Sequence, residues 1–396
     1  MPPATPQFQF IIPGFPAPID AAASLWAEPL NGNMDAGPSG DGSGLSIGDY
    51  FTRAQTFLML DDCRALRLAA SDHGDDSKAK ISAITISLEK HGAFYHPARV
   101  RATFPDIPPL DLALNCAAAS PGLEIIETEY QALKKIKASD PQAPVPEVYG
   151  YGRVQDQDRD TAFFLAQWFD GFHEFHITTP DPGERIVIWE SEEAISFIPF
   201  PRARRLYEKA SEILTSLYNP DTFEQVFPWH HAAGDFVVRL RDGEPELRLI
   251  TVRGYNPMIG LPAGEEPDYD LVLNALLVFL LNLTLRMRID RIDGTGRYHL
   301  MESSVIQATL SGFFKTLPSL DSRFKSALGL GHDFASYIAE FSMDDYAELL
   351  GSIIDSYHPK APETGLLKNN LKEHSRVLGT GIIEMVKKSF FIDKGQ

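Results

Sequence analysis

The chain has 396 residues, of which 44% are hydrophobic and 23% are charged. These proportions are typical of a soluble globular protein, and the length suits two domains or one two-lobed domain. The formal net charge of −18 disfavours nucleic acid and anionic membrane surfaces as partners. Cys63 and Cys116 are too few for a disulfide framework, and the first residues lack a signal-peptide pattern. We therefore expect a cytoplasmic protein.

The N-terminal part is predicted to be a short leader followed by a mixed lobe. Residues 1–48 contain a Pro/Ala-rich start and NGNMDAGPSGDGSG, which are too poor in apolar side chains to offset the entropy lost on ordering, so they predict a flexible leader. Helical spacing of apolar residues predicts a bracing helix over 49–70. Three alternating segments at 84–88, 100–104 and 110–114, an amphipathic helix at 124–138 and two further strands complete a lobe over 49–170.

The remainder, 171–396, is predicted to be a helical lobe. Helices are expected at 202–218, 270–288 and 304–316, and one hairpin at 228–255 has FVVRL and ELRLITV on either side of the turn residues RDGEP. The apolar run at 271–285 is shorter than the ~20 residues that span a bilayer and contains polar residues, so it predicts a buried core helix.

This order of elements resembles the aminoglycoside phosphotransferase and choline kinase branch of the protein-kinase-like fold. ETEYQALKKI followed by VPEVYGYGRV is similar to the family's helix C and fourth strand, and FFLAQWFDG is similar to the fifth strand and hinge. PDYDLV resembles the Asp-Pro-x-x-Asp-Leu-Ala element that opens a C-lobe helix, with Asp270 at the matching Asp, where an Asp also suits an N-cap. The resemblance spans about residues 81–288. It implies an α+β, two-lobed fold with a five-stranded antiparallel N-lobe, helix C and a mainly helical C-lobe.

Phosphoryl transfer requires a lysine held by a glutamate, a carboxylate near the acceptor and ligands for Mg²⁺. LALN at 112–115 resembles the third-strand Val-Ala-x-Lys pattern, so Asn115 takes the place of the lysine and Glu129 matches its helix C partner. An amide cannot neutralise phosphate charge, although it can hydrogen-bond a ribose or phosphate oxygen. The alternative is that Asn115 and Glu129 form a solvated pair without function.

The catalytic loop of the family reads His-x-Asp-x-x-x-x-Asn and runs into a strand. Since FVVRL begins directly after Asp235, the resemblance places Asp235 at the Asn position and His230 at the catalytic Asp, with Thr251 near the second metal-binding Asp. His230 could act as a general base, because an unperturbed imidazole titrates near ~6.5. Asp235 is then the one obvious metal ligand left, so we expect weak magnesium binding.

Two further segments are candidates for nucleotide contacts. HGAFYHP at 91–97 occupies the turn that covers the phosphates in active relatives, which makes His91 and Gly92 candidates. Its single glycine weakens the case for a backbone phosphate cradle, and a decorated hairpin tip is the alternative. At the hinge, the resemblance adds Gln167. The expected cofactor is ATP or GTP with magnesium.

Three functions remain open on the sequence alone. The leading hypothesis is a pseudokinase that binds a nucleotide or other small-molecule ligand in the cleft between its lobes. The second is an active small-molecule phosphotransferase in which His230 and Asp235 replace the usual residues. The third is a non-catalytic scaffold that docks a protein partner. A His-rich metal site, with His173 and His176 joining His230, His231 and Asp235, is a rival chemistry without an accepted zinc spacing.

Overall fold

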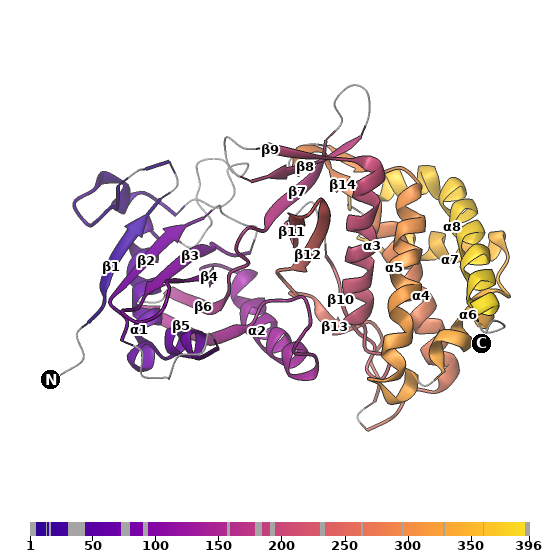
Figure 1. The fold of residues 1–396 in the computed structure, drawn as a ribbon, viewed down its shortest axis with the longest axis horizontal. Helices are drawn as coiled ribbons and strands as arrows, with labels where there is room; N and C mark the ends of the chain where they lie inside the picture. Colours follow the sequence, from indigo (N-terminus) through magenta and orange to yellow (C-terminus); the bar gives the residue numbers. More distant parts are fainter. Residues whose placement is uncertain are drawn as a thin grey trace. The chain divides into compact units, whose positions relative to one another are not determined.

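The computed structural model describes residues 5–12, 14–15, 17–30, 44–72, 80–89, 94–156, 159–178, 184–190, 195–229, 234–262, 264–294, 297–327, 329–358 and 360–392. The chain forms two compact units: Met1–Pro141 with Pro146–Asp170, and Gln142–Val145 with Gly171–Gln396. The N-terminal unit is rich in sheet and the C-terminal unit is mainly helical (Figure 1). The predicted α+β class is therefore confirmed.

The N-terminal unit is built on a six-stranded sheet with the order β1-β2-β3-β4-β6-β5. The strands β2 to β6 pair antiparallel throughout, which confirms the predicted five-stranded sheet. β1 adds a sixth strand, parallel to β2. The strands are β1 (Gln7–Ile11), β2 (Ala83–Leu88), β3 (Ala98–Thr103), β4 (Leu110–Ala117), β5 (Val148–Asp156) and β6 (Arg159–Gln167).

Part of the predicted flexible leader is folded, so the prediction for residues 1–48 is wrong where the structure describes them. The ring of Phe10 lies 4.9 Å from that of Phe51 and 5.4 Å from that of Trp26, between centroids. Leu30 and Leu45 are buried in the same core. The prediction failed because it averaged these apolar residues with the glycine-rich run beside them; most of that run, 31–43, lies outside the described residues.

Two helices cover opposite faces of the N-terminal sheet. α1 (Ile47–Asp72) packs on the face that carries Phe163, whose ring lies 5.3 Å from that of Phe57. α2 (Gly122–Ser139) packs on the other face, where the ring of Phe164 lies 6.4 Å from that of Tyr130. Because neighbouring residues of a strand point to opposite faces, the two contacts place the helices on either side. α1 is interrupted at Leu60–Cys63 by non-helical backbone.

The C-terminal unit contains more sheet than the single predicted hairpin. Its five-stranded sheet has the order β12-β11-β7-β8-β9, and all its pairs are antiparallel. The hairpin of β11 and β12 turns on Asp242 and Gly243, whose φ angles of 54° and 80° suit a two-residue hairpin loop. The strands are β7 (His173–Thr178), β8 (Arg185–Trp189), β9 (Ile195–Pro199), β11 (Phe236–Arg241) and β12 (Glu244–Leu249).

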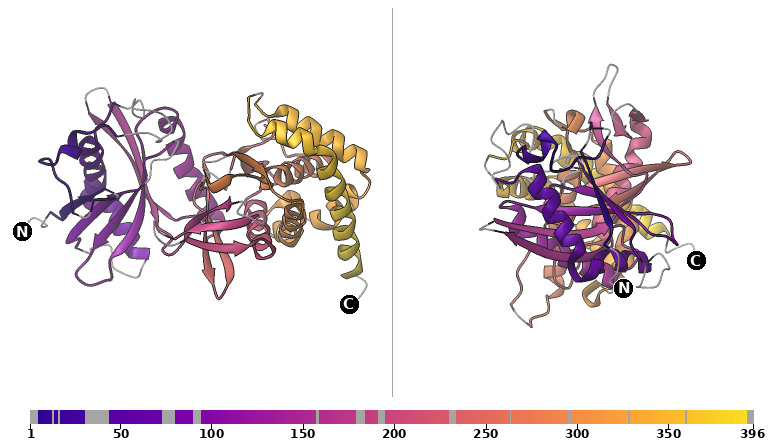
Figure 2. Two further views of the ribbon diagram at one scale, coloured as in Figure 1. Left: turned by 90° about the horizontal axis from the view of Figure 1, so that it is seen from above. Right: turned by 90° about the vertical axis from the view of Figure 1, so that its left-hand side faces the viewer.

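Two short strand pairs and six α-helices complete the described part of this unit. The pairs are β10 (Glu224–Val226) with β13 (Tyr255–Pro257), and β14 (Ile289–Arg291) with β15 (Tyr298–Leu300). α5 is central because it contacts α3, α4, α6 and α8, and these helices lie together in both sets of views (Figures 1 and 2). The helices are α3 (Phe200–Ser216), α4 (Tyr269–Met287), α5 (Ser304–Asp321), α6 (Leu330–Ile338), α7 (Met343–Ser356) and α8 (Thr364–Ile392).

α4 corresponds to the predicted apolar helix. Among the described helices it alone is long and apolar enough to cross a membrane, and 67% of its most apolar segment is buried inside the unit. This degree of burial is typical of a helix in the core of a folded unit. Its N-cap is Asp268, whose carboxylate accepts a hydrogen bond of 2.7 Å from the backbone N–H of Leu271. The cap assigned to Asp270 is therefore wrong: the helix begins one residue earlier than expected, and Asp270 lies in its first turn.

A buried polar chain joins α4 to α8. Nη1 of Arg288 lies 3.3 Å from Nδ1 of His374, and Nε2 of His374 lies 3.1 Å from the hydroxyl of Thr284. That hydroxyl donates to the carbonyl of Leu281 at 2.8 Å. Since Arg288 can only donate, His374 accepts at Nδ1 and donates from Nε2, which requires a neutral ring. Burial, and then the charge of Arg288, lower the pKa of His374 to about 3.

Candidate functional site

Two predicted site residues of the N-terminal unit lie on the same side of its sheet: Asn115 on β4 and Glu129 on α2. Asn115 pairs with Phe164 across β4 and β6, so its side chain shares the face that α2 covers. Glu129, on α2, is 1% exposed and accepts a hydrogen bond of 2.5 Å from the hydroxyl of Tyr95. The ring of Tyr95 in turn packs edge-on against Phe164 at 6.1 Å. A tyrosine hydroxyl is thus one partner of this carboxylate, in a site where the resemblance implies a lysine.

Gln167 ends β6 and is tied to the strand beside it. Its backbone N–H donates to the carbonyl of Glu147 at 2.8 Å, and its side-chain oxygen lies 3.5 Å from the Glu147 nitrogen. The second contact is long for a hydrogen bond, so the amide remains able to bond a ligand. His91 and Gly92 lie outside the described residues, and their predicted role stays a prediction.

The described residues that were predicted to belong to a catalytic loop lie around the start of β11 in the C-terminal unit. Asp235 is 4% exposed, and its carboxylate accepts a bond of 2.6 Å from an Arg253 Nη2. Its carbonyl accepts from the N–H of Ile250 at 2.9 Å, which holds the loop against the chain leaving β12. Thr251 follows directly and is 8% exposed. His230 lies outside the described residues.

Arg253, a neighbour of a predicted site residue, was missed in the sequence analysis. It stands two residues after Thr251 and delivers a permanent positive charge to the carboxylate that was expected to hold magnesium. The metal role of Asp235 stays a prediction, but the structure shows a guanidinium as its neighbour. A signal was present, since an arginine in TVRGY follows the expected metal-binding position at short range. The prediction that Asn115, Glu129, His230 and Asp235 line one cavity also stays a prediction.

The rival His-rich metal site finds no support in the described residues. His173 and His176 are three positions apart on β7, so their side chains point to opposite faces of the strand and cannot share one ion. His176 is buried, and its ring lies 4.9 Å from that of Trp189. Within the described ranges there is no group of three His, Cys, Asp or Glu side chains that could hold a metal.

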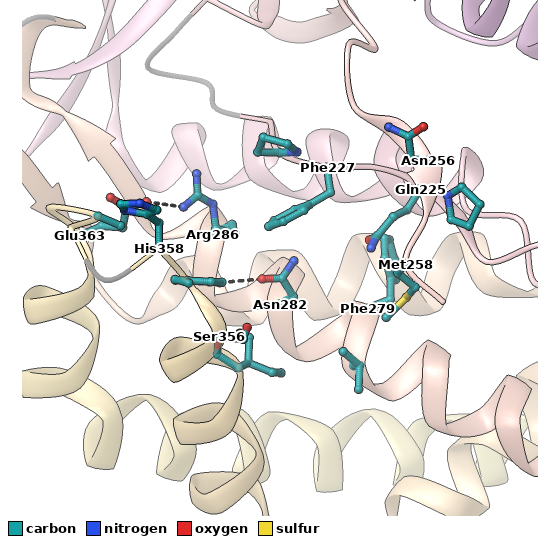
Figure 3. A pocket seen from close by; sticks show the side chains of 16 residues that line it. Gln225, Phe227, Asn256, Met258, Phe279, Asn282, Arg286, Ser356, His358 and Glu363 are labelled. Carbon is teal, nitrogen blue, oxygen red and sulfur yellow. Dashed lines mark hydrogen bonds and ion pairs between the residues drawn. The ribbon is translucent and has the colours of Figure 1, made fainter. Parts of the chain in front are cut away.

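A cavity of about 520 Å³ lies within the C-terminal unit and was not predicted (Figure 3). It is framed by β10, β13, α4, the end of α7 and the connection from α7 to α8. Sequence patterns could not have indicated it, because its lining comes from segments far apart in the chain. The lining residues are Gln225, Phe227, Pro228, Asn256, Pro257, Met258, Val278, Phe279, Asn282, Arg286, Ile353, Ser356, Tyr357, His358, Ala361 and Glu363.

No protein-family model matches the chain, and no curated protein matches it. Among solved structures, the PAN3 pseudokinase of Neurospora crassa in complex with PAN2 is 9% identical with a TM-score of 0.28, and the match covers 79% of this chain and 66% of that one. The Drosophila melanogaster PAN3 pseudokinase is 9% identical with a TM-score of 0.28, covering 79% and 69%. A further Neurospora crassa PAN3 pseudokinase is 10% identical with a TM-score of 0.27, covering 88% and 74%.

The chain thus covers slightly less than two thirds of the first of these chains. At such TM-scores the likenesses carry no argument. What the structure itself provides is the predicted order of elements in the N-terminal unit, with α2 between the third and fourth strands of the five-stranded antiparallel sheet.

Proposed function

We propose that the chain is a divergent protein of the kinase-like type that binds a small ligand without metal-dependent phosphoryl transfer, that is, a pseudokinase. The ion pair between Asp235 and Arg253 carries the proposal. Magnesium requires oxygen ligands at ~2.0–2.1 Å in near-octahedral geometry. A buried carboxylate that already accepts a charge-assisted hydrogen bond of 2.6 Å from a guanidinium is poorly suited to such an ion.

Two further residues support the absence of turnover. Asn115 offers an amide in place of a phosphate-neutralising lysine, and Thr251 offers a hydroxyl in place of a carboxylate. Losing one preorganised electrostatic contact typically costs ~10²–10³ in rate, although such losses are not additive. Asn115 and Gln167 keep hydrogen-bonding capacity for a nucleotide or similar ligand. The proposed ligand therefore binds through hydrogen bonds and without magnesium.

The test is thermal unfolding of the full chain with ATP and GTP, in the presence of Mg²⁺, Mn²⁺ or EDTA. A ligand that binds only the folded state adds about 2.7 kcal/mol of stability at 100 times its Kd. We expect nucleotide stabilisation that EDTA leaves unchanged. In parallel, radiolabelled ATP and GTP should give no transfer to aminoglycosides, choline or sugars.

A matched pair of variants sharpens the test. Arg253→Met removes the guanidinium beside the carboxylate of Asp235, so Mg²⁺ should newly increase the stabilisation by nucleotide. Arg241→Met, at the exposed end of the same hairpin, should leave the response as in the wild type. Rapid transfer by the wild type that Asp235→Asn abolishes would overturn the proposal in favour of an active phosphotransferase. Stabilisation by neither nucleotide under any condition would favour the scaffold.

A further inference from the structure

The face of α4 that lines the cavity of Figure 3 changes from apolar to polar along the helix. Val278 and Phe279 precede Asn282 by four and three residues and Arg286 follows it by four, so they lie on one side of the helix, and all four line the cavity. The first two are apolar. The last two carry N–H donors. A ligand lying along this face therefore meets hydrocarbon at one end and hydrogen-bond donors at the other.

Arg286 has a donor that its protein partner does not use. Its Nη1 donates to a Glu363 carboxylate oxygen at 2.6 Å, and the two side chains are only 10% and 11% exposed. Its Nε is buried without a hydrogen-bond partner among the described residues, and this burial also keeps it out of reach of a ligand. The bond to Glu363 uses one of the five N–H groups of the guanidinium, so terminal N–H groups remain as donors for a ligand.

Asn282 presents a second donor one helical turn away. The hydroxyl of Tyr357 donates to its side-chain oxygen at 2.6 Å, which fixes the orientation of the amide. The amide nitrogen of Asn282 therefore lies on the side away from this hydrogen bond, as Figure 3 shows. Each of the two α4 side chains thus has one partner from the connection between α7 and α8, and each keeps further N–H donors while lining the cavity.

Charge and shape then restrict what the donors can bind. The charge of Arg286 is already balanced by Glu363, so an anionic ligand would place a second negative charge beside that carboxylate. An uncharged carbonyl avoids this repulsion. The rings of Phe227 and Phe279 offer apolar contact to a flat group, and Gln225 and Asn256 supply amides at the opposite side of the cavity.

We propose that this cavity binds an uncharged aromatic amide, whose carbonyl accepts hydrogen bonds from Arg286 and Asn282 while its ring packs against Phe227 and Phe279. The volume of about 520 Å³ suits a compact small molecule. The site lies entirely within the C-terminal unit, uses none of the residues assigned to nucleotide binding and does not depend on the proposed function.

The experiment is isothermal titration calorimetry of the full chain with two probes that differ in charge. N-Acetyl-L-phenylalaninamide is the uncharged aromatic amide, and N-acetyl-L-phenylalanine is its carboxylate counterpart. For a ligand of about 15 non-hydrogen atoms we expect a Kd of roughly 0.5 mM for the amide. The carboxylate should bind at least ~10-fold more weakly, because of its repulsion by Glu363.

Three variants locate the binding. Asn282→Asp keeps the acceptor for Tyr357 but replaces the donor, and Arg286→Lys keeps a charge for Glu363 but removes the second terminal nitrogen of the guanidinium; each should weaken amide binding about 10-fold. Ser356→Trp, at an exposed position of the lining, should fill the cavity and abolish binding. The control is Asn274→Asp, on the same helix outside the cavity, where the amide oxygen likewise accepts from a tyrosine hydroxyl at 2.7 Å.

The control variant should bind the amide like the wild type. The proposal is overturned if the carboxylate binds as tightly as the amide, or if neither probe binds up to several times the expected Kd. It is equally overturned if the amide binds unchanged to Ser356→Trp and Asn282→Asp, because the ligand then sits elsewhere. If Arg286→Lys does not fold, Asn282→Asp and Ser356→Trp still decide the question.

Discussion

Removal of the Arg253 guanidinium is the most direct perturbation of the proposed pseudokinase site. The side chain of Asp235 is 5% exposed and that of Arg253 is 25% exposed, with 2.6 Å between Oδ1 and Nη2. Removing one partner of a buried ion pair costs ~3–5 kcal/mol, because the remaining charge stays buried without its counter-charge. Since a quarter of Arg253 is open to solvent, we expect about 2–4 kcal/mol for Arg253→Met.

The measurement is urea-induced unfolding at pH 7 of four proteins: the wild type, Arg253→Met, Asp235→Asn and the double variant. If the loss comes from an uncompensated carboxylate, the double variant should be less destabilised than the sum of the single ones, by a coupling energy of about 1–3 kcal/mol. Arg241→Met should stay within about 0.5 kcal/mol of the wild type. An additive cycle, or an Arg253→Met variant as stable as the control, would refute the assignment of Arg253 as the counter-charge.

Three further changes test the packing of each unit. Between pH 6.5 and 4 the unfolded chain protonates His374, whereas the native chain, in which this histidine has a pKa of about 3, does not. The free energy of unfolding should therefore fall as the pH decreases. Urea unfolding at each pH should show this fall to be steeper in the wild type than in His374→Gln by about 1.4 kcal/mol per pH unit. Gly312→Ala should lower stability by about 1–3 kcal/mol in the same assay, because its methyl group would overlap the Glu208 carbonyl of α3, whereas Gly351→Ala meets only Leu371 at 3.6 Å and should be neutral or slightly stabilising. Tyr95→Phe should cost about 1–3 kcal/mol by removing a donor to buried Glu129, and a neutral outcome in thermal unfolding would contradict that pairing.

Local patterns in the sequence were sufficient for much of the N-terminal unit. Alternation at 84–88 and 100–104 indicates strands because each buries every second side chain, and both strands are present. The helix at 124–138 was predicted from its apolar stripe, and the structure extends it only to Gly122–Ser139. RDGEP specified a turn because Asp and Gly tolerate the positive φ values of a tight hairpin.

Features that depend on distant partners could not be predicted in the same way. The alternation in QFQFI suits a strand, but the sequence does not show that β1 pairs with β2, more than seventy residues later. At the start of α4, Asp268 and Asp270 both suit an N-cap, and only the backbone geometry selects Asp268. α3 and β10 separate β7, β8 and β9 from the hairpin of β11 and β12 along the chain, so the sequence did not show that these strands join the hairpin in one sheet.

The predicted role of Asp235 depends on its pairing with Arg253. By itself, a carboxylate at the position where the resemblance implies an asparagine would strengthen a metal site. With Arg253 beside it, the charge of this carboxylate is balanced by the guanidinium of a protein side chain. A magnesium ion can coordinate phosphate oxygens while it keeps its protein ligands. A guanidinium binds each acceptor through its own directional N–H groups. An arginine in this position therefore favours a fixed, hydrogen-bonded site over a metal site whose ligands change during phosphoryl transfer. For this reason the response of the protein to Mg²⁺ should change when Arg253 is replaced.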